Sequence, residues 1–242
     1  LTPRALLDRI VAGRVIQYPL TIVEGWTFRQ LRQALMAHPR LVQTLSGLSD
    51  AEVMARLGRP GEHPEGWFLP DTYHFPAGFT DEAFLRRARA AMDQRLREIW
   101  DRRAPDAPVN DPYQALILAS IIEKETGIAA ERAEIAGVFA RRLRQGMRLQ
   151  TDPTVIYGLG EAFDGNLHRR DLETDTPYNT YTRSGLPPTP IALPGIAALE
   201  AAVNPASGDT LYFVADGKGG HVFSRTLDEH NRAVRQYRLQ ER

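Results

Sequence analysis

The chain has 242 residues, in which 30 lysines and arginines balance 30 aspartates and glutamates, so its formal net charge is zero. This balance lacks the basic excess that nucleic-acid binding needs, and we expect no nucleic-acid partner. The absence of cysteine excludes disulfides, thiolate metal sites and cysteine nucleophiles. The sequence also has no run of 18 or more apolar residues, so nothing in it predicts a membrane-spanning helix.

Residues 1–58 predict a small α/β unit. Thr2 is placed to cap a short amphipathic helix that Gly13 ends, and alternating β-formers predict a strand over residues 14–23. Two further helices are expected after residues suited to N-capping, Thr27 and Ser49. The apolar face of the first of these helices would carry Phe28, Leu31, Leu35 and Met36.

Residues 59–78 are rich in proline, glycine and aromatic side chains. The aromatic residues indicate a structured loop, because flexible linkers are built from glycine and serine. Thr80 then begins a helix predicted to run to about Arg102, with apolar residues at helical spacing. Helices and strands do not alternate regularly along the chain, which predicts an α+β fold rather than a doubly wound parallel sheet.

The stretch LILASIIEKETG, residues 116–127, predicts a core helix that nevertheless carries two glutamates. At 100° per residue, one apolar stripe combines Leu118, Ile121, Ile122 and Glu125. Glu123 falls on nearly the opposite side of the helix. We therefore expect Glu125 to point into the core, close to the helix end that Gly127 marks.

A carboxyl group among apolar side chains is either paired with a cation or poorly solvated. In the first case, Glu125 would pair with an arginine such as Arg132 or Arg141. In the second case its pKa would rise towards neutral pH, as a general acid requires. The residues of this stretch leave both alternatives open.

Residues 147–194 show little regular periodicity and predict long proline-braced loops. Two segments here, MRLQTDPTVIYGLG and TPYNTYTRSGLPPTPIALPG, are rich in amides, hydroxyls and aromatic rings. Such groups are typical of carbohydrate sites, although they could instead satisfy the backbone of their own loops. Long irregular loops inside a compact domain are usually functional, which favours a carbohydrate site.

The chain closes with a predicted glycine-rich hairpin, LYFVADGKGGHVFS, and a helix that starts at Leu227. The hairpin does not have the spacing of a phosphate-binding loop. The histidines are scattered and form no H-x-x-x-H pair, so we expect neither a metal site nor a cofactor.

Together, several long segments resemble the MltG (YceG-like) family of endolytic murein transglycosylases. These segments are ASIIEKETG, ERAEIAGVFARRLRQGMRLQTDPTVIYGLG, PYNTY, GLPPTPIALPG and LYFVADGKGGHVFS, with VEGWTFRQL and EGWFLPDTYHFPAG upstream. The resemblance implies a small LysM-like α/β region over residues 1–58 and a mixed catalytic domain over residues 59–242 that contains the buried glutamate-bearing helix. A strand upstream of residues 14–23 is missing, so we expect the LysM-like region to be incomplete.

The resemblance also implies an activity. Family members cut peptidoglycan strands between N-acetylmuramic acid and N-acetylglucosamine without hydrolysis, leave 1,6-anhydro-muramic ends, and are expected to terminate growing strands. The family's catalytic glutamate matches Glu125, which would act as general acid and then as base. The substrate-binding residues expected with it are Gln150, Asp152, Thr154, Tyr157, Tyr178, Asn179, Tyr181 and Glu65.

Two alternatives remain open. The first is a muramidase-type hydrolase, in which Asp152 or Glu123 would help water to attack. The second is a non-catalytic glycan-binding scaffold of the wall-synthesis machinery, which would not need the carboxyl group of Glu125.

Location and partners follow from the same resemblance. Family members are anchored in the bacterial cytoplasmic membrane by one N-terminal helix, with the enzyme on the periplasmic side. Because this chain begins at Leu1, we expect a trimmed product that lacks the anchor and behaves as a soluble fragment. Peptidoglycan strands are the expected partner, with cell-wall synthases as candidate protein partners.

Overall fold

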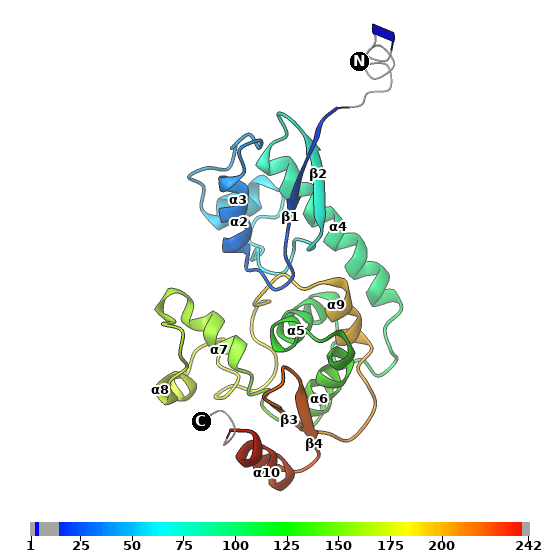
Figure 1. Ribbon diagram of the computed structural model, residues 1–242, viewed down its shortest axis with the longest axis vertical. Helices are drawn as coiled ribbons and strands as arrows, with labels where there is room; N and C mark the ends of the chain where they lie inside the picture. The colour runs from blue at the N-terminus through cyan, green and yellow to red at the C-terminus, as the bar shows by residue number, and fades with distance from the viewer. Residues whose placement is uncertain (1–2, 5–14, 239–242) are drawn as a thin grey trace.

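The computed structural model describes residues 3–4 and 15–238, which form an upper and a lower unit in the view of Figure 1. The upper unit contains β1 (Gln17–Thr21), α2 (Phe28–Ala37), α3 (Asp50–Arg56) and β2 (Thr72–Pro76). The long helix α4 (Asp81–Asp101) runs from this unit into the lower one. Apart from residues 3–4, the helix predicted after Thr2 lies outside the described residues.

The sheet of the upper unit joins segments that are far apart in the sequence. β1 pairs antiparallel with β2, so that Gln17 lies opposite Pro76 and Thr21 opposite Thr72. The partner of β1 therefore comes from downstream, and the prediction that residues 59–78 form only a loop is wrong. The sheet spans the predicted division at residue 58; that division itself stays a prediction.

The helices of the upper unit begin where capping chemistry predicts. Thr27 and Ser49 each form a capping box, with Gln30 and Glu52 respectively, which satisfies free N–H groups of the first turn. The prediction that Met36 belongs to the buried apolar face is wrong, because the exposed fraction of this residue is 53%. At 100° per residue it lies on the edge of the stripe that the buried residues Phe28, Leu31 and Leu35 form.

The lower unit is built around α5 (Pro112–Glu125), which packs against α4, α6 (Arg132–Arg144) and α9 (Ile196–Val203). Every residue of α5 from Ala115 to Ile122 is buried. This stretch is apolar on all sides, as is typical of a helix without a solvent face, and Glu123, which follows it, does not point to solvent. Its side chain is only 6% exposed, so both glutamates of this helix are withdrawn from water.

The segment 147–194 is more regular than the sequence predicts. It contains α7 (Asp152–Leu159) and α8 (Arg169–Glu173), with Pro153 in the first turn of α7, where a missing N–H costs nothing. Both helices are too short to show a clear period. The helix α9 was also not predicted, since its eight residues are nearly all apolar.

The C-terminal elements agree with the prediction. β3 (Tyr212–Ala215) and β4 (His221–Ser224) form an antiparallel hairpin, and α10 (Leu227–Arg238) packs against it. Both sheets among the described residues are two-stranded and antiparallel, which confirms the α+β class. No helix within residues 15–238 has both the length and the apolar character that crossing a bilayer requires.

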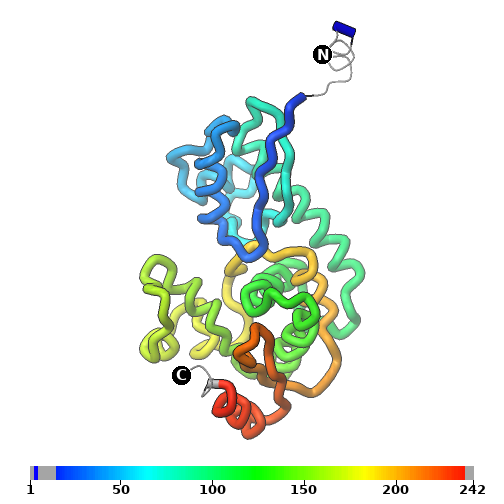
Figure 2. Tube along the Cα trace, in the orientation of Figure 1, coloured from blue at the N-terminus to red at the C-terminus, as the bar shows by residue number. Residues whose placement is uncertain are grey.

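The two units are joined by a segment that returns along their boundary, as the chain trace in Figure 2 shows near residue 190. Leu193 forms two backbone hydrogen bonds with the turn after β1. Its N–H donates to the carbonyl of Trp26, and its carbonyl accepts the N–H of Gly25. Gly66 lies against the same segment with a φ of +85°, and a Cβ added there would lie 2.6 Å from Pro190. The boundary is therefore closely packed.

Gly66→Ala should destabilise the protein strongly, because it combines a left-handed backbone with a clash at this boundary. We expect a loss of about 2–5 kcal/mol in the free energy of unfolding, measured by urea denaturation. Gly61→Ala is the matched control, with a φ of +83° and nothing within 4 Å of the added Cβ. It should cost only about 1–2 kcal/mol. Equal losses would show that the contact with Pro190 contributes nothing.

Candidate active site

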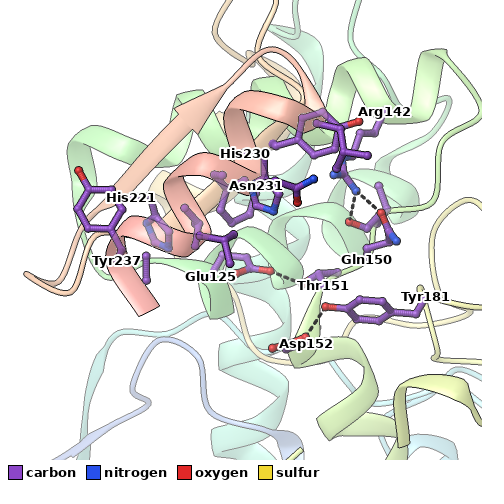
Figure 3. A pocket seen from close by; sticks show the side chains of 17 residues that line it. Glu125, Arg142, Gln150, Thr151, Asp152, Tyr181, His221, His230, Asn231 and Tyr237 are labelled. Atoms are coloured by element: carbon purple, nitrogen blue, oxygen red, sulfur yellow. Dashed lines mark hydrogen bonds between the residues drawn. The ribbon is translucent and has the colours of Figure 1, made fainter. Parts of the chain in front are cut away.

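A pocket of about 610 Å³ opens at the C-terminal end of α5, where Glu125 is the last helical residue. Its walls come from α5, α6, the start of α7, the loop at Tyr181, the β3–β4 hairpin and α10. Polar side chains from all of these elements face it, as Figure 3 shows. They include Glu125, Arg142, Gln150, Thr151, Asp152, Tyr181, His221, His230, Asn231 and Tyr237.

Glu125 is poorly solvated and has no arginine partner. Burial raises the pKa of Glu125 to about 7, and the nearby charge of Asp152 acts in the same direction. A hydrogen bond donated by Thr151 Oγ1 and the proximity of His221 oppose this rise in pKa. Of the two alternatives for this glutamate, the structure therefore shows the poorly solvated carboxyl group.

The arginines proposed as partners of Glu125 bind elsewhere. Arg132 lies 3.5 Å from the carboxylate of Glu123, and Arg141 donates to the backbone carbonyls of Thr210 and Ala206. Glu123 also accepts a 2.9 Å hydrogen bond from the N–H of Gly195, immediately before α9. Although burial raises the pKa of Glu123 as well, this residue does not line the pocket. Glu123 therefore holds the start of α9 in place.

The residues that support Glu125 lie on a strained turn. Gln150 has a φ of +54°, the one positive value among the non-glycine residues that the structure describes. Its N–H donates to the carbonyl of Thr180 at 3.1 Å, and its side chain accepts from Arg142 at 3.1 Å. A left-handed backbone at a non-glycine residue persists only where its surroundings enforce it. Here these bonds place the next residue, Thr151, so that its hydroxyl reaches Glu125.

Four of the predicted site residues meet in this pocket: Glu125, Gln150, Asp152 and Tyr181. The hydroxyl of Tyr181 donates to the carboxylate of Asp152 at 2.5 Å, as the dashed line in Figure 3 indicates. Burial and this bond to Asp152 both raise the pKa of Tyr181, so the phenol stays protonated. Asp152 therefore accepts this bond, and both side chains line the pocket.

Two other predicted residues are buried behind the pocket wall. Thr154 bonds to the carbonyl of Thr151 and to the hydroxyl of Thr180. Asn179 donates to the carbonyls of Asp171, Leu172 and Thr174 and accepts from the N–H of Tyr181. These bonds satisfy loop backbone, and their effect is to fix Thr151 and Tyr181. The predicted binding role of Thr154 and Asn179 stays a prediction that the geometry does not favour.

The remaining predicted residues form a separate cluster between the two units. Tyr157 donates to the carboxylate of Glu65 at 3.1 Å and meets the ring of Tyr178 edge-on, with centroids 5.1 Å apart. Glu65 is 3% exposed and also accepts the N–H of Phe28, the first residue of α2. Burial raises the pKa of Glu65 to about 7. None of these three residues lines the pocket at Glu125.

The most informative residue that the sequence analysis missed is His221, at the start of β4. Its ring lines the pocket, and its Nδ1 lies 2.8 Å from Glu131 Oε2. The hairpin itself was predicted, but nothing local in GKGGHVFS indicates that it folds back towards a residue almost 100 positions earlier. Thr151 lies within a segment already noted as polar. Arg142, His230, Asn231 and Tyr237 also line the pocket and were not predicted.

The donor set of the pocket is not that of a metal centre. Within residues 15–238, no three His, Asp or Glu side chains are placed to hold a metal ion.

The raised pKa of Glu125 has a consequence for stability. The folded protein holds this proton up to about pH 7, whereas an unfolded glutamate releases it near 4.5, so the wild type loses stability as pH rises between these values. Glu125→Gln removes this loss, which is on the order of 2–3 kcal/mol. Urea denaturation from pH 4.5 to 7.5 should show the variant gaining stability relative to the wild type. A difference that does not change with pH would contradict this assignment.

Comparisons with known proteins show which family the chain belongs to. The chain is 34% identical over 250 residues to an endolytic murein transglycosylase of Bacillus subtilis, covering 96% of this chain and 69% of that protein. It is 32% identical over 224 residues to an endolytic murein transglycosylase of Streptococcus pneumoniae, covering 90% of this chain but 38% of that protein. A crystal structure of a yceG-like protein from Listeria monocytogenes superposes with a TM-score of 0.75 at 34% identity, over 95% of this chain and 80% of the other. The model of the YceG-like family matches residues 1–236, and this chain therefore belongs to the YceG-like family.

Proposed function

We propose that this protein is an endolytic murein transglycosylase in which Glu125 is the general acid. The observation that carries the proposal is a carboxyl group with a pKa of about 7, placed in a polar pocket without an arginine partner. Such a group is still protonated near neutral pH and can give its proton to a leaving oxygen. The names of the relatives in Bacillus and Streptococcus indicate the substrate, which is murein.

The reaction can proceed with one acidic carboxyl group. Glu125 protonates the glycosidic oxygen between N-acetylmuramic acid and N-acetylglucosamine as the bond to C1 breaks. The C6 hydroxyl of the same muramic residue then attacks C1 and closes the 1,6-anhydro ring. In the simplest scheme the ionised Glu125 takes up the proton of that hydroxyl. Asp152, Gln150 and Tyr181 lie where they can bind the sugar ring and its substituents.

A hydrolase would need a second group to activate water, since glycosidases normally use two carboxyl groups. Of the two residues considered for that role, Glu123 is bound to Gly195 and Arg132 outside the pocket. Asp152 does line the pocket, but it accepts a short bond from Tyr181. The geometry thus favours attack by the sugar's own hydroxyl. A scaffold that only binds glycan would have no use for an acid with a raised pKa.

The proposal extends to the protein's setting. Murein lies outside the cytoplasmic membrane, so the active site works on the extracytoplasmic side, next to a membrane anchor. Internal cuts in a growing strand would end its elongation, and this places the enzyme beside cell-wall synthases.

The first test is mass spectrometry of purified glycan strands incubated with the parent protein and with Glu125→Gln. We expect anhydro-ended fragments from the parent and a rate at least about 10²–10⁴ times lower for the variant. The control is Glu123→Gln, on the same helix, whose amide can still accept the N–H of Gly195; it should remain active.

Each other outcome has a distinct meaning. Reducing ends from the parent would establish the hydrolase instead. Failure of the parent to cut, with binding retained, would favour the scaffold.

The pH profile provides a second test. Because Glu125 must be protonated, kcat/KM should fall as pH rises above about 7. The bond from Thr151 lowers the pKa of Glu125, so Thr151→Val should move this alkaline limb to higher pH. Initial rates of glycan cleavage between pH 5 and 9 measure both effects. A limb that stays in place, or moves to lower pH, would mean that it reports another group.

A further inference from the structure

A histidine–carboxylate pair adjoins Glu125 and has no role in the simplest scheme. Glu131 Oε2 lies 2.8 Å from His221 Nδ1, and Glu131 Oε1 accepts the backbone N–H of His221 at 3.0 Å. Thr126, the residue after Glu125, donates to the same carboxylate at 3.3 Å. The end of α5 thus contacts the pair directly, and His221 lies next to Glu125 in Figure 3.

The pair determines which nitrogen of the ring faces the pocket. A carboxylate can only accept, so Nδ1 carries the proton and the lone pair of the neutral ring is on Nε2. No described residue forms a hydrogen bond with Nε2, although the ring lines the pocket. Nε2 of His221 is therefore available as a proton acceptor for a bound molecule.

The ring is held rigidly. It meets Phe213 edge-on at 5.3 Å and lies 6.5 Å from Phe223, between centroids. Gly220 lets the carboxylate come close, since a Cβ there would lie 2.9 Å from Glu131 Oε1. Burial of the pair is substantial, with 13% of the His221 side chain and 17% of the Glu131 side chain exposed. A surface ion pair would not be enclosed in this way.

We propose that His221, oriented by Glu131, is the base that accepts the proton of the attacking C6 hydroxyl. This inference rests on the proposed transglycosylase function and deepens it. As the bond from C1 to the leaving oxygen breaks, the proton of Glu125 moves to that oxygen. The bond between O6 and C1 forms while the hydroxyl proton moves to Nε2 of His221. After the product leaves, water in the pocket returns the proton from His221 to Glu125, and no oxidation or reduction is involved.

The charges around His221 suit a base. The carboxylate of Glu131 stabilises a proton that is transferred to the ring, as carboxylates do in other histidine–carboxylate pairs. The other ionisable groups that line the same pocket are Glu125 of α5, Arg142 of α6, Asp152 of α7, Tyr181, Tyr212 of the hairpin, and His230 and Tyr237 of α10. Asp216 of the hairpin accepts the N–H of Gly220, the residue before His221. The base must be neutral and Glu125 must be protonated, so we expect a bell-shaped rate profile.

The test is the pH profile of anhydro-product formation by the full chain and by His221→Gln. We expect kcat to fall about 10²–10⁴-fold, KM to stay within about threefold, and the acidic limb of the profile to disappear. Glu131→Gln should keep an acidic limb, moved to lower pH, because the ring loses its negative partner. The matched control is His168→Gln, since His168 forms a histidine–aspartate pair with Asp164 at 3.2 Å outside the pocket. It should leave the profile unchanged.

Rescue by added imidazole distinguishes a catalytic role of His221 from a structural one. His221→Ala should regain activity when imidazole is added, whereas a residue that only supports the fold would not respond. Retention of the acidic limb and of most of the rate in His221→Gln would overturn the inference, as would a lack of rescue in a folded His221→Ala. If the parent gave no anhydro ends, the proposed function itself would fail, so the two failures are distinguishable.

Discussion

Burial of α5 on every side is the constraint on which the rest of the structure depends. From Ala115 to Ile122 the helix has no solvent face, so the two glutamates that follow must find partners at its C-terminal end. Glu123 finds them in Gly195 and Arg132. Glu125 finds only a hydroxyl group and remains poorly solvated beside a pocket. The same packing that stabilises the core thus raises the pKa of Glu125.

The pocket is assembled from segments that hold one another in place. The strained turn at Gln150 directs Thr151 towards Glu125, and it is held by Arg142 of α6 and by Thr180 of a later loop. A cost of roughly 1–3 kcal/mol for such a backbone is acceptable only where several bonds oppose its relaxation. Most of the polar groups in the PYNTY segment serve this purpose. They position Thr151 and Tyr181 in the wall of the pocket.

The buried cluster around Glu65 connects this assembly to the upper unit. Glu65 joins the first N–H of α2 to the hydroxyl of Tyr157, and Tyr157 belongs to α7, the helix that begins just after Thr151. The two units are therefore linked through hydrogen bonds that end on α7, the helix whose first residue, Asp152, lines the pocket.

The sequence by itself determined the local features of this protein. Capping residues predicted the starts of α2, α3 and α4, apolar spacing predicted α4 and α5, and the stripe through Leu118 and Ile122 singled out Glu125. Only the tertiary structure decided that β1 pairs with β2, that Glu123 is also buried, and that His221 lies beside Glu125. The physical reason is the distance along the chain over which each effect acts. Capping and periodicity act within a few residues, whereas burial and the meeting of side chains almost 100 residues apart depend on how the whole chain packs.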